Sequence, residues 1–264
     1  PMSAGTSDVY VEAVGYISVD TTTVTVTAPG MTMANRTVGS GLQDFSAVSL
    51  GATLPANDTL VIASSDPNIL VAPNDGNTLG SDTLRLTGQT TSFTFYIQAL
   101  EGFVGTATIT SSAPGFTDGV ATATAVQPGV RIRSVLTSST TLSGNDIIWA
   151  DVGPENGAGS LSELQPVRAG AAPLTVTFIS SAGAVASLVT QTETNDTVTA
   201  QIAPNTANTP TALSAGGVEL DPLTAGTSDI YVEAPGYVSV DTSTINITAP
   251  TINMVNRTVG AGLQ

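Results

Sequence analysis

A long internal repeat constrains this 264-residue chain more than any other feature. Residues 4–43 return without a gap as residues 225–264, 221 positions later, and 28 of the 40 aligned positions are identical. Several of the differences exchange Val for Ile, which keeps a buried β position apolar and branched. We therefore expect the two stretches to fold alike. A chain that starts partway through one unit and stops soon after the next begins is also what an excerpt of a longer array would look like.

A weaker echo divides the period into two modules. Three similar tetrapeptides, at residues 13–16, 113–116 and 234–237, each precede a Thr-rich alternating run that ends at a proline: Pro29, Pro128 and Pro250. Their spacing predicts modules of roughly 100 and 120 residues, the size of one β-sandwich each. We predict residues 1–29 as the last strands of a preceding domain, 30–129 and 130–250 as two complete domains, and 251–264 as the first strand of the next unit.

Apolar and polar residues alternate with period two throughout both modules, so the expected fold class is all-β with almost no helix. Residues 151–170 read as an irregular insertion, and 38–43 as the first strand region of the first module. The predicted strands are 44–51, 58–63, 69–72, 82–87, 92–99, 105–111 and 119–126 in the first module, and 147–150, 174–180, 186–191, 197–202, 229–234 and 238–248 in the second.

The composition removes several chemistries. The chain has no Cys, no His and no Lys, which rules out disulfides, thiol or imidazole catalysis and a lysine Schiff base. A net charge of −15 makes nucleic acid a poor partner. No run approaches the ~20 apolar residues that span a bilayer, and no targeting segment is visible near residue 1. An apolar share of 41% still predicts packed cores.

Several motifs carry a resemblance to a known family. They are SSDPNIL (64–70), GSDTL (80–84), FYIQALEG (95–102) and GTATITSSAPGF (105–116). This part of the chain resembles the tandem bacterial immunoglobulin-like domains of large repetitive cell-surface and adhesin proteins. Residues 130–250 match less closely, chiefly through 218–223 and 225–240. The resemblance implies an extracellular spacer, stalk or adhesin rod, and it implies no ligand.

Calcium is the one cofactor that oxygen ligands alone could hold, so Asx-rich loops are candidate sites. The possible ligands are Asp66, Asn68, Asp75, Asn77 and Asp82 in one region and Asp146, Asp151 and Glu155 in another. The spacing matches no EF-hand, and turn formation accounts for the first group without a metal.

These observations favour a structural, non-catalytic repeat of an extracellular filament, stalk or adhesin rod that associates with neighbouring repeats or chains. The alternative is an adhesive module that recognises a glycan or a surface partner through loops at one sandwich end, with the 151–170 insertion and Trp149, the single Trp, as candidate surface. An enzyme using Asp151 and Glu155 as a carboxylate pair is the least favoured interpretation, and we expect no catalytic residues.

Overall fold

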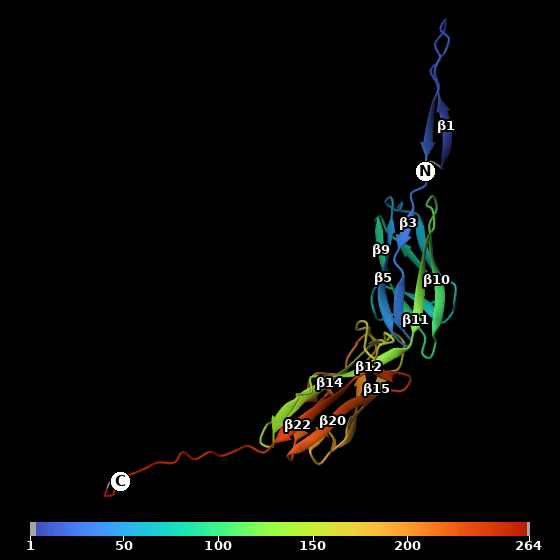
Figure 1. Cartoon of the computed structure of the whole chain (residues 1–264). Helices are drawn as coiled ribbons and strands as arrows, with labels where there is room; N and C mark the ends of the chain where they lie inside the picture. The colour runs from blue at the N-terminus through green and yellow to red at the C-terminus, as the bar shows by residue number, and fades with distance from the viewer. Residues whose placement is uncertain (1–3, 263–264) are drawn as a thin grey trace.

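The computed structural model describes residues 4–262, which form an elongated chain of three bodies and a tail (Figure 1). An isolated hairpin is followed by two β-sandwiches, at residues 30–126 and 128–248, and then by an extended segment. The one helical element in this part of the chain is a single 3-10 turn, Leu213–Ala215. The expected all-β fold class is confirmed.

The first sandwich consists of two packed sheets. One has the order β3 (Met31–Met33), β5 (Gln43–Leu50), β9 (Ser92–Ala99) and β7 (Ile69–Pro73). The other has the order β4 (Arg36–Gly39), β11 (Gly119–Val126), β10 (Gly105–Ser112), β6 (Thr59–Ser64) and β8 (Thr83–Thr87).

The second sandwich repeats this plan. Its first sheet has the order β17 (Thr194–Asn195), β16 (Ala186–Val189), β19 (Val218–Pro222), β14 (Asp146–Pro154), β12 (Pro128–Arg133) and β21 (Val238–Ser239). Its second sheet has the order β13 (Ser138–Thr140), β22 (Thr242–Thr248), β20 (Gly226–Glu233), β15 (Leu174–Ser180) and β18 (Thr197–Ile202).

Both sandwiches divide their first strand between the two sheets. In the first, β3 pairs antiparallel with β5, and β4 then crosses to pair parallel with β11. In the second, β12 pairs antiparallel with β14, and β13 crosses to pair parallel with β22. One sheet then continues with β5, β9 and β7 in the first sandwich and with β14, β19 and β16 in the second. The other sheet continues with β11, β10 and β6, or with β22, β20 and β15, which is the immunoglobulin arrangement with β8 or β18 added at its edge. The chain is a tandem of immunoglobulin-like sandwiches.

Period-two alternation builds the cores. β10 and β18 bury every second residue and turn threonines outward, as a half-buried strand must. Phe95 and Phe178 are the largest fully buried side chains, one in each sandwich. Small apolar residues fill the rest, and the buried set forms one cluster that continues from the first sandwich into the second.

Two expectations about local structure are corrected. The first strand region of the first module begins earlier than residue 38, as β3 and β4, and Ser40–Leu42 form a turn. The insertion starts after Pro154 instead of at 151, because Asp151–Pro154 continue β14 by pairing with β12. Gly153 and Pro154 look like turn residues in the sequence. Gly153 is needed here for packing, since a Cβ there would overlap the carbonyl oxygen of Glu163 in the insertion.

The two ends of the described chain stand apart from the sandwiches (Figure 1). The hairpin pairs β1 (Gly5–Val9) with β2 (Thr22–Val26), and residues 251–262 belong to no sheet. The predicted end segments also include residues 1–3 and 263–264, which lie outside the described residues. Within residues 4–262, no helix is long and apolar enough to cross a membrane.

Candidate functional site

The insertion of the second sandwich crosses the joint between the two bodies. Val167 forms a β-bridge with Leu42, in the turn that follows β4 of the first sandwich. Two backbone hydrogen bonds flank this bridge: Gln43 N–H donates to the Pro166 carbonyl at 2.9 Å, and Arg168 N–H donates to the Gly41 carbonyl at 3.0 Å. A segment that reads as a loop in the sequence therefore becomes a strand-like contact between domains.

Gln165 anchors the start of this bridge. Its side chain is buried, and its Oε1 accepts a hydrogen bond from Gly39 N–H at 2.9 Å. Its Nε2 donates to the Thr37 carbonyl at 2.8 Å and to Glu163 Oε1 at 2.9 Å. One glutamine of the second sandwich thus satisfies two backbone groups of the first. This stabilises the joint, because a buried backbone group without a hydrogen-bond partner costs free energy.

A buried pair of glutamines lies on the other side of the bridge. Gln43 and Gln98 are directly opposite each other on β5 and β9, and neither side chain is exposed to solvent. Gln98 Nε2 donates to Gln43 Oε1 at 3.0 Å, and Ala169 N–H of the second sandwich donates to the same oxygen at 3.0 Å. Gln43 Nε2 donates to Asn205 Oδ1 at 3.1 Å, again across the joint. The network therefore connects two neighbouring strands of the first sandwich with the second sandwich through one set of amides.

Asn205 and Gly76 close this network at its rim. Asn205 has a positive φ of 63°, a conformation that Asn tolerates better than most residues. A Cβ at Gly76 would lie 2.7 Å from Asn205 Oδ1, so the position requires glycine. Asn205 Nδ2 also donates to Asn77 Oδ1 at 3.2 Å, which joins the loop after β18 to the loop after β7.

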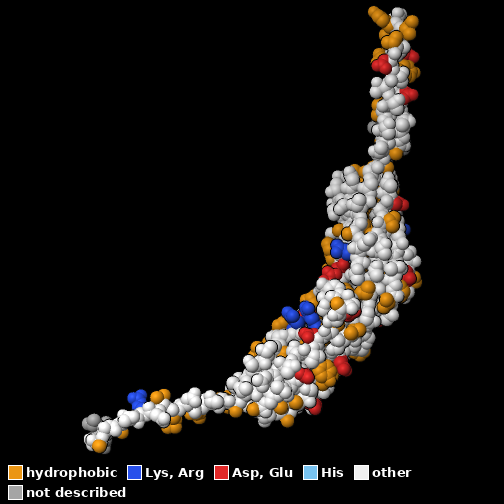
Figure 2. Space-filling model, viewed as in Figure 1, with side chains coloured by type: hydrophobic (Ala, Val, Ile, Leu, Met, Phe, Trp, Pro, Cys, Tyr) orange, Lys and Arg blue, Asp and Glu red, His pale blue; other side chains and the backbone are white. Residues whose placement is uncertain are grey.

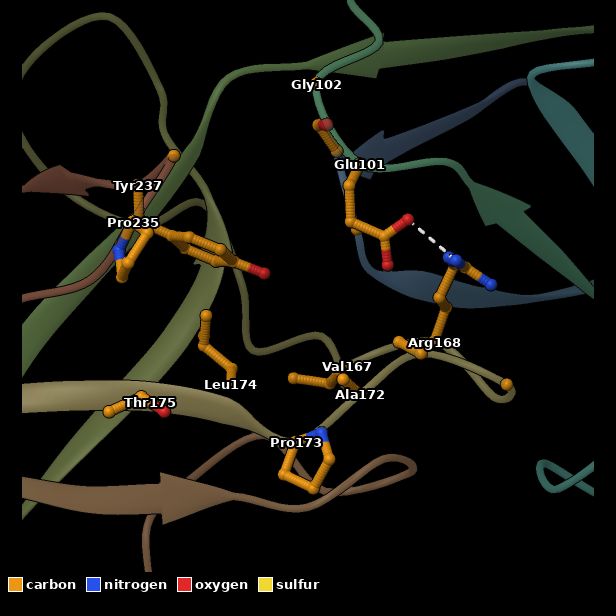
Figure 3. A pocket seen from close by; sticks show the side chains of 15 residues that line it. Glu101, Gly102, Val167, Arg168, Ala172, Pro173, Leu174, Thr175, Pro235 and Tyr237 are labelled. Carbon is orange, nitrogen blue, oxygen red and sulfur yellow. Dashed lines mark hydrogen bonds and ion pairs between the residues drawn. The ribbon is translucent and has the colours of Figure 1, made fainter.

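A cleft of about 560 Å³ opens beside the joint, lined by residues of both sandwiches (Figure 3). Arg168 and Glu101 form an ion pair on one side of it, with Arg168 Nη2 2.6 Å from Glu101 Oε2. Tyr237, Leu174 and Pro173 supply apolar surface on the opposite wall. Burial raises the pKa of the Tyr237 hydroxyl above its usual range, and the negative charge of Glu101 adds to this effect. The hydroxyl is therefore a neutral hydrogen-bonding group.

Carboxylates of opposite domains approach each other at this joint. Burial raises the pKa of Asp44, and the charge of Glu163 in the insertion raises it further, whereas Arg36 and the Phe45 amide act in the opposite direction. The Arg36 guanidinium lies 3.8 Å from Asp44. The ionised form of Asp44 is thus disfavoured in the folded protein.

The first group of predicted calcium ligands is divided between two separate turns. Asp66 Oδ1 accepts from the backbone and side-chain amides of Asn68, at 2.8 and 2.9 Å. Asp75 accepts from the Asn77 and Thr78 amides and from the Thr78 hydroxyl. These hydrogen bonds lower the pKa of Asp75, with the Thr78 hydroxyl contributing most. Asp82 precedes β8 and is exposed. Both bonded carboxylates thus act as turn formers.

The second group is also dispersed. Asp151 is buried beside two guanidinium groups, 3.2 Å from Arg131 and 3.4 Å from Arg133. Glu155 accepts from Gly159 N–H at 3.0 Å, and Asp146 lies at the far end of β14. Among residues 4–262, no three His, Cys, Asp or Glu side chains are placed to hold a metal ion together. Calcium binding stays a prediction, and the change in melting temperature when calcium replaces a chelator would test it.

Trp149 does not accompany the insertion. It lies on β14 opposite Arg133 of β12, is partly exposed, and is absent from the lining of the cleft. The insertion itself is used by the joint. The surface predicted for glycan recognition is therefore divided between two places.

The sequence-based interpretation did not identify the joint residues Gln43, Gln98, Gln165 and Arg168. One signal was present for Gln43, which ends the repeated stretch and recurs at position 264, outside the described residues. No pattern in a single sequence connects the other three with their partners, which lie far away along the chain: Gln43 for Gln98, the Gly39 and Thr37 backbone for Gln165, and Glu101 for Arg168.

Comparisons with known proteins give only distant likenesses. No protein-family model and no curated protein matches the chain. Among solved structures, domains 5-6 of the S-layer protein SbsC are similar with 16% identity and a TM-score of 0.29, over 82% of this chain and 94% of that one. The adhesin InvE of Yersinia pseudotuberculosis is similar with 13% identity and a TM-score of 0.32, over 82% of this chain and 58% of that one. The polymeric Ig receptor ectodomain of a teleost fish is similar with 11% identity and a TM-score of 0.33, over 84% of this chain and 100% of that one. The chain thus spans little more than half of the adhesin structure.

Proposed function

We propose that the chain is a structural, non-catalytic repeat segment of an extracellular filament, stalk or adhesin rod, assembled through contacts between successive domains. The observation that carries this proposal is the buried amide network of Gln43, Gln98 and Gln165, which fixes one sandwich against the next. A module whose task is to transmit length and direction needs such a joint. A pair of independent binding domains on a flexible linker does not.

The connection between the sandwiches supports the same proposal. β11 ends at Val126 and β12 begins at Pro128, so Gln127 is the only residue between them. Its side chain is also engaged, because its Nε2 donates to the Gly236 carbonyl at 2.8 Å. The proline fixes its own φ. A linker of one bonded residue leaves the second sandwich little freedom to rotate about the first.

The repeat extends the proposal to the ends of the chain. We propose that residues 1–29 are the last strands of a preceding immunoglobulin-like domain and that residues 251–264 are the first strand of the next unit. In the described part, residues 252–260 belong to no sheet, and their counterparts 31–39 form β3 and β4. Identical neighbours would then recur at each joint.

Small-angle X-ray scattering of the full chain, combined with distance measurements between spin labels, tests the rod. Because the chain has no Cys, single cysteines introduced at exposed positions carry the labels without background. We expect an elongated particle with a narrow distribution of distances between the two sandwiches. A broad distribution would contradict the proposal. Antibody labelling of intact producing cells tests the extracellular location, and signal only after permeabilisation would contradict it.

A second candidate function is adhesion through a glycan or a surface partner, with calcium as a possible aid. The cleft favours it, since Tyr237 offers an aromatic surface beside the Arg168–Glu101 ion pair. Aromatic stacking combined with charged hydrogen bonding is a common way to hold a polar ligand. Ligand-observed NMR with acidic and neutral oligosaccharides tests it. Adhesion at the cleft would be supported if saturation is transferred from the protein to the sugars and if the Leu174→Asn substitution abolishes this transfer.

A further inference from the structure

The hairpin formed by residues 4–29 carries an apolar face that nothing in the described chain covers. Val9 is 54% exposed, Val11 80% and Val24 46%. The sheet contains only β1 and β2, and Figure 2 shows hydrophobic side chains open to solvent along this narrow body. A two-stranded hairpin alone is marginal in water, so this face is suited to contact with another body.

The second sandwich contains the same hairpin in a covered state. β1 and β2 pair Gly5 with Val26, and β20 and β22 pair Gly226 with Ile247, each 221 positions later. The side-chain contacts also repeat. Thr23 Oγ1 donates to Asp8 Oδ1 at 2.6 Å, and Thr244 Oγ1 donates to Asp229 Oδ1 at 2.5 Å.

The tips of the two hairpins agree as well. Tyr16 N–H donates to the Ala13 carbonyl at 3.0 Å, and Tyr237 N–H donates to the Ala234 carbonyl at 3.1 Å. Gly15 and Gly236 both have a left-handed φ, of 86° and 81°. The uncovered hairpin therefore already has the conformation that the sandwich requires.

The covered hairpin shows what the uncovered one lacks. Ile230 and Val232, the counterparts of Val9 and Val11, are completely buried. β15 pairs with β20 along one edge, with Phe178 opposite Val232, and β13 pairs with β22 along the other. The sheet of β12, β14 and β19 closes the apolar face.

We propose that the hairpin docks onto a second copy of the second sandwich, in the place that β20 and β22 occupy in this one. This inference rests on the proposed scaffold function and names its partner. Val11 would lie opposite Phe178 of the second copy. Tyr16 would reach the second copy's joint, as Tyr237 reaches the joint here.

Competition between the hairpin and a copy's own β20 and β22 decides how the copies must be arranged. In a folded copy the place is already filled by its own β20 and β22, which carry Ile where the hairpin carries Val9, Val24 and Val26. Each Val is one methylene smaller and fills the core less completely. Separate copies therefore keep their own strands and stay monomeric. The hairpin docks where the copy before it in series ends at residue 221, ahead of β20, and so has no β20 or β22 of its own.

A protein made of residues 1–221 followed directly by the complete chain tests this arrangement, because it keeps the spacing of the repeat. A single cysteine at Val11→Cys of the internal hairpin reports burial through its reaction with a thiol reagent. We expect it to react about a hundred-fold more slowly than Val11→Cys in the single chain, because reaction then requires local opening. Val24→Cys, on the other strand, should be protected in the same way.

Glu12→Cys is the matched control. Its counterpart Glu233 is exposed in the second sandwich, so this thiol should react equally fast in both proteins. Equal reactivity of the position 11 and 24 thiols in the serial and single proteins would overturn the inference, and so would dimers of the single chain in light scattering. Scattering of the serial protein separates the two proposals. An extended rod with reactive thiols defeats only the docking, whereas a flexible particle defeats the scaffold.

Discussion

Replacing Gln165 by alanine removes the side chain that joins the insertion to the first sandwich. The substitution loses the bonds to Gly39 N–H and to the Thr37 carbonyl, and it leaves the Gly39 N–H buried without a partner. An unsatisfied buried donor costs about 1–3 kcal/mol, and the second bond contributes about 1 kcal/mol. We therefore expect the joint to lose about 3 kcal/mol, which favours its opening by roughly two orders of magnitude.

Amide hydrogen exchange measures this opening. The Arg168 N–H bonds to the Gly41 carbonyl across the joint, so its exchange should become about a hundred-fold faster. The Phe178 amide in the core of the second sandwich should keep its protection. Gln191→Ala, at an exposed turn, is the control and should change neither amide. Unchanged exchange at Arg168, or an equal loss of protection at both amides, would refute the assignment of Gln165 to the joint.

Three further predictions concern charge and core packing. Asp44→Asn should raise the melting temperature at pH 7 and give no gain below pH 3.8. The pKa of Asp44 is raised in the folded protein, so the contribution of this side chain to stability is complete at low pH, where it is protonated, and is lost as the pH rises. Asp75→Asn should lower the melting temperature at pH 7, because the pKa of Asp75 is lowered by hydrogen bonds that its ionised form accepts, and the difference from the original chain should close as the pH falls below 3.8. Calorimetry across this pH range checks both variants. Equal pH profiles for the two would be inconsistent with these assignments. Phe178→Ala should destabilise the second sandwich by about 3–5 kcal/mol. Denaturant unfolding followed by the fluorescence of Trp149, the single Trp and a residue of that sandwich, should then show an earlier transition, and an unchanged midpoint would mean that the second core does not depend on this ring.

Regular alternation made much of the fold predictable. The strands at 92–99, 119–126, 174–180 and 197–202 have the same bounds in the sequence interpretation and in the structure. Short strands were missed. Met31–Met33, Ser138–Thr140 and Thr194–Asn195 have no more than three residues, too few to show a period. Val218–Pro222 was missed although it alternates, because paired glycines precede it and a proline ends it.

The site was much less predictable than the fold. Gln165 lies in a segment of Ser, Glu, Leu and Pro that looks like any solvated loop. It becomes a buried anchor only because Gly39 and Thr37, more than a hundred residues earlier, turn their backbone groups toward it. Asp66 and Asp75 gave the opposite result, since the sequence marked them as possible ligands and the structure uses both carboxylates in their own turns.

The sequence by itself determined what repeats and what chemistry is absent: a period of 221 residues, strands throughout, and no Cys, His or Lys. These properties depend on local pattern and on composition, both of which can be read without knowing any contact. Only the tertiary structure decided which polar side chains are buried and which apolar face is left open. Burial of Gln43 depends on segments as distant as Asn205, and exposure of Val11 depends on a partner sheet that the same sequence supplies only to Val232. Both outcomes depend on which segments meet, and alternation along one strand carries no information about that.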